Sequence, residues 1–331
     1  MMRISTMSAC KQPPPPPPPL MNFPGGGMIN MDQLIIPRQR RKEKAVVVMG
    51  ATGTGKSRLS IDLATRFDAE VVNSDKMQVY KGLNIITNKV TGDECRGVPH
   101  HLLGFVDPDR DFSAAEFACH AAIAAADIAG RGRLPILAGG SNSCIKALVC
   151  DHIDFFEKYE VCFIWVDVSM PVLHSFVSKR VDQMVAAGLV EEAREFYDPA
   201  GDYSRGIRRA IGVPEMDEFF RAEGGGAAGK LLELGIEKIK ANTCKLACTQ
   251  FQNILRLCEV LEWRVHRVDA TEAFLSRGEE SDEAWERLVA GPSTRIVGQF
   301  LCEDQIDLVS TAAAAVILSG PTNAAVAAAT H

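Results

Sequence analysis

The chain has 331 residues, of which 47% are hydrophobic and 24% are charged, as is ordinary for a soluble globular enzyme. Its formal net charge of −6 argues against nonspecific nucleic-acid binding, which requires a basic surface. Its ten cysteines include no C-x-x-C pair, so we expect reduced thiols and neither a disulfide framework nor a zinc site.

The first 44 residues are predicted to form a disordered extension. They contain seven consecutive prolines, Pro13 to Pro19, and three consecutive glycines, Gly25 to Gly27, which cannot build a core. Basic residues outnumber acids in this segment, as in an organelle transit peptide, but serine is scarce. Targeting to an organelle and retention in the cytosol therefore both stay open.

The stretch "AVVVMGATGTGKS" predicts a phosphate-binding loop between a buried strand at 45–49 and a helix at 56–67. It fits the pattern G-x-x-x-x-G-K-[ST], in which backbone N–H groups and the helix N-terminus hold phosphate. The lysine adds a full charge, and the final hydroxyl suits Mg²⁺, here Ser57. The predicted loop comprises Gly50, Ala51, Thr52, Gly53, Thr54, Gly55, Lys56 and Ser57.

Further apolar runs alternate with helical patterns along the chain. Strands are expected at 70–73, 100–106, 161–168 and 264–270, and 133–143 is expected to form a strand followed by a loop. A helix at 114–130 should begin at Ser113, with Glu116 completing a capping box. This order predicts an α/β fold, a P-loop NTPase-like doubly wound parallel sheet. The segments "GATGTGKS", "SDKMQ" and "GGSNS" should then meet in one cleft beyond the strands' carboxyl ends.

The second half of the chain is helical in its spacing. We predict a core from 45–169 and 236–308, with a smaller helical insertion at 170–235. A loop is expected at the glycines 224–226, and a long helix at 236–262 should return to the core. Residues 309–331 form a low-complexity, alanine-rich tail, and no run is long and apolar enough to suggest a membrane span.

The position of the acidic residues does not favour nucleotide hydrolysis. A second acid that holds Mg²⁺ usually follows an apolar strand, but "PILAGG" ends in glycines and Asp167 lies far along the chain. Asp75, in "NSDKMQVY", is the prominent acid near the loop. It can act as a general base toward an incoming nucleophile, or it can be an ordinary turn residue.

Several motifs in this order resemble the isopentenyltransferases of the dimethylallyl-diphosphate class, and most of all the plant adenylate isopentenyltransferases that make cytokinin precursors. They are "GATGTGKS", "EVVNSDKMQVYKGLNIITNKVT", "GVPHHLLG", "ILAGGSNS", "GIRRAIGVPE", "ANTCKLACTQFQNILRL" and "WERLVAGPS". The likeness covers about 45–305 and leaves out both tails.

The resemblance implies that the loop holds the diphosphate of dimethylallyl diphosphate while the N6 amine of adenine attacks its prenyl group. Asp75 would then take the amine proton, and Lys56 with Mg²⁺ at Ser57 would stabilise the departing pyrophosphate. One of the two neighbouring arginines in "GIRRAIG" would reach a phosphate. The further candidates for substrate binding are Ser74, Lys76, Gln78, Ser141, Asn142, Ser143, Arg180, Arg208, Arg209 and Lys245.

The acceptor is expected to be a free adenine nucleotide, ATP, ADP or AMP. Transfer RNA is the alternative acceptor, but the chain is acidic and has no zinc-finger spacing at its C-terminus. A small-molecule kinase or a noncatalytic nucleotide switch would use the same loop, at the cost of leaving the downstream motifs unexplained. We expect a monomer that acts in the plastid or the cytoplasm.

Overall fold

A computed structural model describes residues 41–222 and 225–302 of the chain. The predicted extension, except for its last few residues, and the predicted alanine-rich tail lie outside the described residues. From Lys42 onward the described chain forms one compact unit. The nine cysteines within the described part are free thiols. None of the helices in that part is long and apolar enough to cross a membrane.

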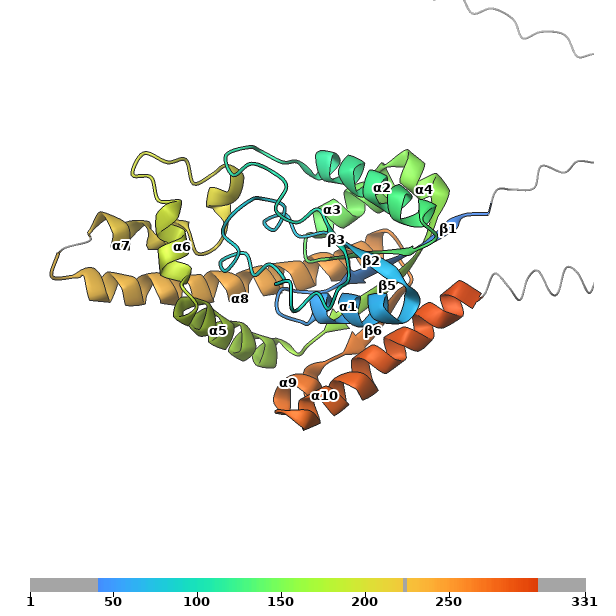
Figure 1. Ribbon diagram of the computed structural model, residues 1–331. Coiled ribbons are helices and arrows are strands. Elements are labelled where there is room, and N and C mark those ends of the chain that lie inside the picture. Colours follow the sequence, from blue (N-terminus) through green and yellow to red (C-terminus); the bar gives the residue numbers. More distant parts are fainter. Residues whose placement is uncertain (1–40, 223–224, 303–331) are drawn as a thin grey trace, which may run out of the picture. The chain divides into compact units, whose positions relative to one another are not determined.

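Six parallel strands form a single sheet in the order β3-β2-β4-β1-β5-β6. The strands are β1 (Glu43–Met49), β2 (Ala69–Asn73), β3 (His100–His101), β4 (Leu134–Gly139), β5 (Tyr159–Asp167) and β6 (Val265–Asp269). This confirms the predicted doubly wound α/β class, in which helices cover both faces of a parallel sheet (Figure 1).

The central strand β1 shows why both faces are buried. Its residues alternate between two hydrophobic cores: Ala45, Val47 and Met49 pack into one core, and Val46 and Val48 pack into the other. All five are completely buried. Because successive side chains of a strand point to opposite faces, a continuous apolar run requires a layer of helices on each side.

The helices are α1 (Lys56–Phe67), α2 (Ala114–Gly130), α3 (Asn142–Lys146), α4 (Ile153–Lys158), α5 (Met170–Ala186), α6 (Leu189–Glu195), α7 (Asp217–Arg221), α8 (Ala228–Val260), α9 (Thr271–Leu275) and α10 (Glu279–Trp285). Helices α2 and α3 contribute to the first core, and α1 and α10 contribute to the second. Residues 291–302 form a further helix. Short 3₁₀ turns lie at Gly206–Arg209 and Pro214–Met216, and π-helical turns lie at Ala147–Asp151 and Glu286–Ala290.

The predicted capping box of α2 is confirmed. Ser113 Oγ accepts a hydrogen bond from the Glu116 N–H at 3.1 Å, and the Glu116 carboxylate accepts one from the Ser113 N–H at 2.9 Å. The predicted strand at 100–106 is wrong beyond His101, because Leu102 and Gly104 take positive φ angles of 62° and 59° that end the extended backbone.

Two predictions about the site segments also need correction. The loop expected at the end of 133–143 stops before 143, because α3 begins at Asn142. The long helix α8 has 33 residues and begins at Ala228 rather than at 236. The expected boundary between insertion and core therefore falls inside α8, and the two parts share this helix (Figure 1).

Candidate active site

The carboxyl ends of β1, β2 and β4 open into one cavity of about 810 Å³. Its wall includes residues from the phosphate loop, from 73–78 and from 138–143, as predicted from the sheet order. Residues of α5 and α8 also line the cavity. The cavity is large enough for a ligand of drug-like size, and such pockets in parallel sheets are usual binding sites.

The last position of the phosphate loop before the helix requires glycine. Gly55, the N-cap of α1, has a φ of 92°, and a Cβ at this position would lie 2.6 Å from the ring of Trp285. No larger residue fits there, because both the backbone angle and the neighbouring indole exclude a side chain. The Lys56 ammonium donates a hydrogen bond to the carbonyl of Ala51 across the loop at 2.7 Å. The loop is thus an anion cradle at a helix N-terminus, with its lysine in place.

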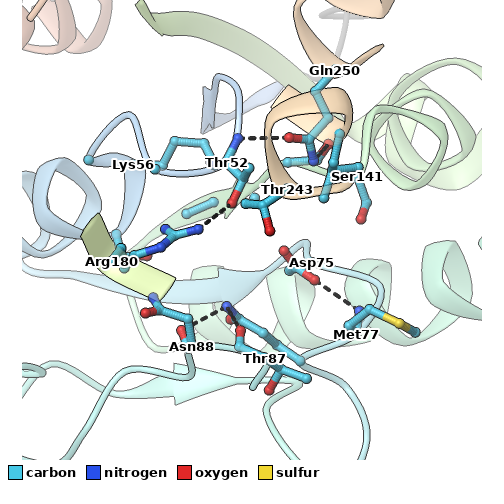
Figure 2. A pocket seen from close by; sticks show the side chains of 18 of the residues that line it. Thr52, Lys56, Asp75, Met77, Thr87, Asn88, Ser141, Arg180, Thr243 and Gln250 are labelled. Atoms are coloured by element: carbon cyan, nitrogen blue, oxygen red, sulfur yellow. Dashed lines mark hydrogen bonds between the residues drawn. The ribbon is translucent and has the colours of Figure 1, made fainter. Parts of the chain in front are cut away.

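Positive charge dominates the cavity wall. Lysine and arginine line it at Lys56, Arg58, Lys76, Arg180 and Arg209, whereas Asp75 is the only acid among the described residues of the wall. Arg180 donates a hydrogen bond to the Thr52 hydroxyl at 3.1 Å, and burial lowers the pKa of its guanidinium (Figure 2). Such a wall favours a polyanionic ligand.

Burial also makes the Lys56 ammonium easier to deprotonate. It lowers the pKa of Lys56 to about 8; the Asp75 carboxylate opposes this shift, and Arg180 adds to it. A diphosphate bound in the loop would supply negative charge and favour the protonated lysine.

The Asp75 carboxylate is fixed by a local turn. Its Oδ1 accepts a hydrogen bond from the Met77 N–H at 2.9 Å, and its own N–H donates to Asn73 Oδ1 at 3.1 Å. Ser141 Oγ accepts from the Lys76 N–H at 2.8 Å, which attaches this turn to the loop after β4. Asp75 is therefore a turn residue and a cavity acid at the same time, so the two readings of the sequence are not exclusive (Figure 2).

Most of the predicted site residues come together. The cavity wall contains Thr52, Gly53, Gly55, Lys56, Ser57, Asp75, Lys76, Gln78, Ser141, Asn142, Ser143, Arg180 and Arg209. Gly50, Ala51 and Thr54 belong to the loop but do not line the cavity. Ser74 is completely buried, and its hydroxyl has no hydrogen-bond partner within the described structure.

Two predicted phosphate-binding residues lie outside the cavity. Arg208 forms an ion pair with Asp109 on the surface, whereas its neighbour Arg209 lines the cavity and donates to the Tyr80 hydroxyl at 3.3 Å. Consecutive residues of a tight turn point in different directions, so only one of the pair can reach the site. Lys245 is exposed on α8 and does not line the cavity, because the helix turns a different face toward the site.

Sequence reasoning missed the contribution of α8. Thr243, Gln250 and Asn253 line the cavity from this helix. Their spacing of seven and three residues places them on one helical face, which is the signal that could have identified them. His100 also lines the cavity, and burial lowers the pKa of its imidazole.

The donor set fits a Mg²⁺ ion held mainly by a phosphate ligand. Mg²⁺ in such sites takes one or two protein oxygens and completes its shell with phosphates and water. The Ser57 hydroxyl, which lines the cavity, is the oxygen that would hold it. Asp167, at the end of β5, does not line the cavity and is bonded to Arg267 at 2.5 Å. No cluster of three His, Cys, Asp or Glu side chains suited to a metal occurs in residues 41–222 and 225–302.

Comparison with known proteins places the chain among prenyl-transferring enzymes. A model of the IPP transferase family matches residues 78–158 and 152–255. The chain is 60% identical over 287 residues to adenylate isopentenyltransferase 5, chloroplastic, of Arabidopsis thaliana, with 85% of each protein covered. It is 54% identical to adenylate isopentenyltransferase 7, mitochondrial, of the same plant, with 82% of this chain and 83% of the relative covered.

A solved structure agrees with the fold. The full-length tRNA isopentenylpyrophosphate transferase from Bacillus halodurans superimposes with a TM-score of 0.66 at 26% identity. The match covers 80% of this chain and 99% of the bacterial one. The described core therefore has the architecture of that enzyme.

Proposed function

Because the chain belongs to the IPP transferase family and, within it, to the adenylate isopentenyltransferases, we propose that it transfers a dimethylallyl group from dimethylallyl diphosphate to N6 of a free adenine nucleotide. Pyrophosphate is the second product, and the reaction is the first step of cytokinin biosynthesis. The observation that carries the proposal is the cavity itself, whose wall contains the phosphate loop, several cations and the Asp75 carboxylate.

The proposed reaction forms one bond and breaks one. The adenine N6 lone pair attacks C1 of the prenyl group, the C1–O bond breaks, and its electrons leave with pyrophosphate. Negative charge accumulates on the leaving group, where the loop N–H groups, Lys56 and Arg180 stabilise it. The Ser57 hydroxyl would hold a Mg²⁺ ion, which when bound would supply further neutralisation of the same charge.

Asp75 accepts the proton that the amine loses. The exocyclic amine is a weak nucleophile because its lone pair is delocalised into the ring, so orientation contributes as much as basicity. The turn that fixes Asp75 through Met77 and Asn73 supports this role, since it removes rotational freedom from the carboxylate. General-base assistance of this kind contributes about 10²–10⁴-fold to a rate.

A free nucleotide is the proposed acceptor. The adenylate isopentenyltransferases share up to 60% of their residues with this chain, whereas the bacterial enzyme for tRNA shares 26%. The net charge of −6 supports the same choice, because tRNA binding favours a basic surface.

A product assay tests the proposal directly. Purified protein, Mg²⁺ and dimethylallyl diphosphate are mixed with ATP, ADP, AMP and unmodified tRNA, and products are detected by mass spectrometry. A prenyl mass on a free nucleotide is expected and identifies the preferred one. Prenylated tRNA alone would overturn the acceptor, and consumption of ATP without prenylation would overturn the reaction.

We also propose that the chain acts inside an organelle, since relatives that share 60% and 54% of its residues are named chloroplastic and mitochondrial. A fluorescent fusion of the whole chain should enter plastids or mitochondria, and a fusion that begins at residue 45 should not. Cytosolic fluorescence of both fusions would contradict this. The expected monomeric state stays a prediction for light scattering to test.

A further inference from the structure

The side chain of Gln250 connects two loops of the active site. Its Oε1 accepts a hydrogen bond from the Thr52 N–H at 2.7 Å (Figure 2). Its Nε2 donates to the Gly140 carbonyl at 2.9 Å. The partners fix the orientation of the amide, because a backbone N–H only donates and a carbonyl only accepts. Gln250 is 8% exposed; its bond to Gly140 is buried and its bond to Thr52 is partly buried.

The surroundings are shaped to receive this amide. A Cβ at position 140 would lie 2.5 Å from Gln250 Nε2, so glycine is required there for the approach. Asn142 Nδ2 donates to the backbone carbonyl of Gln250 at 3.1 Å, which fastens α8 to the start of α3, directly after this loop.

The connection continues to the carboxylate. Gly140 precedes Ser141, whose hydroxyl accepts from the Lys76 N–H at 2.8 Å, and Lys76 follows Asp75. Hydrogen bonds therefore lead from the phosphate loop, through Gln250 and the loop after β4, to the turn that carries Asp75. These two ends are where the leaving group and the base must lie.

We propose that Gln250 is a positioning residue that sets the separation between the diphosphate cradle and the Asp75 carboxylate. Gln250 lines the cavity, and in this role it acts through its hydrogen bonds to Thr52 and Gly140. The role of Asp75 in this inference rests on the proposed function, whereas the clamp on the phosphate loop does not. Misplacement of reacting groups by about 1 Å can cost 10²-fold in rate, which is the scale expected for loss of the clamp.

The test compares Gln250→Leu with Gln252→Leu. Leucine keeps the approximate volume but neither hydrogen bond, and Gln252 is exposed on the same helix. For Gln250→Leu we expect kcat to fall about 10²-fold and the Kd for pyrophosphate to rise about tenfold, since the free loop is less preorganised. Calorimetry should still find one pyrophosphate per chain. Gln252→Leu should match the wild type in all three measurements.

A double-mutant cycle separates positioning from simple damage. Ser141→Ala breaks the same connection further along, so its effect on kcat should be largely absent in the Gln250→Leu background. Additive losses, unchanged kcat and Kd, or a binding stoichiometry that falls in proportion to kcat would each overturn the proposal. Wild-type turnover in the same assay tests the proposed function separately, and pyrophosphate affinity tests the clamp even without turnover.

Discussion

At the scale of single residues, a substitution of Asp75 gives the most direct test of the proposed chemistry. Asp75→Asn keeps the shape of the side chain and its acceptor oxygen for the Met77 N–H, but it removes the base. We expect kcat to fall about 10²–10⁴-fold with nucleotide binding retained. Single-turnover kinetics and nucleotide titrations measure the two effects separately. Unchanged turnover would remove Asp75 from the mechanism.

The Lys56 ammonium should give the enzyme a pH dependence. Its pKa of about 8 in the free protein means that the protonated, phosphate-binding form prevails below pH 8. The affinity for dimethylallyl diphosphate should therefore weaken as the pH rises above 8, by about fivefold between pH 8 and 9 and by about tenfold per further pH unit.

A matched variant isolates this effect. Lys56→Arg stays protonated over the whole range, so its affinity should be flat between pH 8 and 9.5 even if it is weaker throughout. An equal slope in both proteins would assign the pH dependence to another group.

The neighbouring arginines provide an internal control for the charge of the cavity. Arg209→Gln removes a cation from the cavity wall. It should raise the KM of the phosphate-bearing substrate that this side chain contacts about tenfold, because charge-assisted phosphate contacts are strong. Arg208→Gln breaks only the surface ion pair with Asp109 and should leave KM within a factor of two. Steady-state kinetics of both variants measure these KM values. A larger rise in KM for Arg208→Gln than for Arg209→Gln would contradict the placement of both side chains.

At the scale of elements, a buried carboxylate connects β2, β3 and the turn after α2. Glu70 is 2% exposed and accepts hydrogen bonds from His101, Arg131 and Arg133 at 2.6, 2.7 and 3.0 Å. Burial alone would raise the pKa of Glu70, but these three donors hold it at about 2 instead of the ordinary 4.5.

The lowered pKa gives a stability prediction with a definite sign. The stabilisation is complete above about pH 4.5 and is lost as the pH falls toward 2. Glu70→Gln should lower the free energy of unfolding by about 2 kcal/mol at pH 7, and the difference from wild type should shrink below pH 4.5. Denaturant titrations at several pH values test this, with the exposed Glu157→Gln as a control. A constant difference down to pH 2.5 would contradict the assignment.

Local patterns predicted the elements better than they predicted the partners of those elements. The β1 run, the phosphate loop and the α2 cap are specified by residues next to one another, and each was predicted correctly. The roles of Gln250 and Arg209 depend on which face of a helix or turn meets the cleft. That choice is made by tertiary packing across more than a hundred residues, which one sequence does not display.

At the scale of the whole molecule, the phosphate loop is joined to distant parts of the chain. Gln250 of α8 bonds to Thr52, and Trp285 of α10 packs on Gly55 while its indole N–H donates to Asp62 of α1 at 2.9 Å. A ligand in the loop should therefore stabilise the entire described unit. Pyrophosphate at 100 times its Kd should add about 2.7 kcal/mol to the free energy of unfolding.

Thermal unfolding with and without pyrophosphate measures this stabilisation, with sodium chloride at equal ionic strength as the control. Lys56→Ala should abolish most of it, because the charge that binds the anion is gone. Stabilisation that persists undiminished in Lys56→Ala would place the pyrophosphate elsewhere on the protein.

The shared helix α8 also limits which insertions and deletions the sequence of such a protein can tolerate. One residue inserted into a continuous helix rotates everything downstream by about 100°. An insertion between Ala228 and Thr243 would thus turn Gln250 away from Thr52, although neither residue was altered. Insertions and deletions in related sequences should therefore accumulate in the segment before α8 and be absent within it. The length of α8 should stay constant while its residues are substituted.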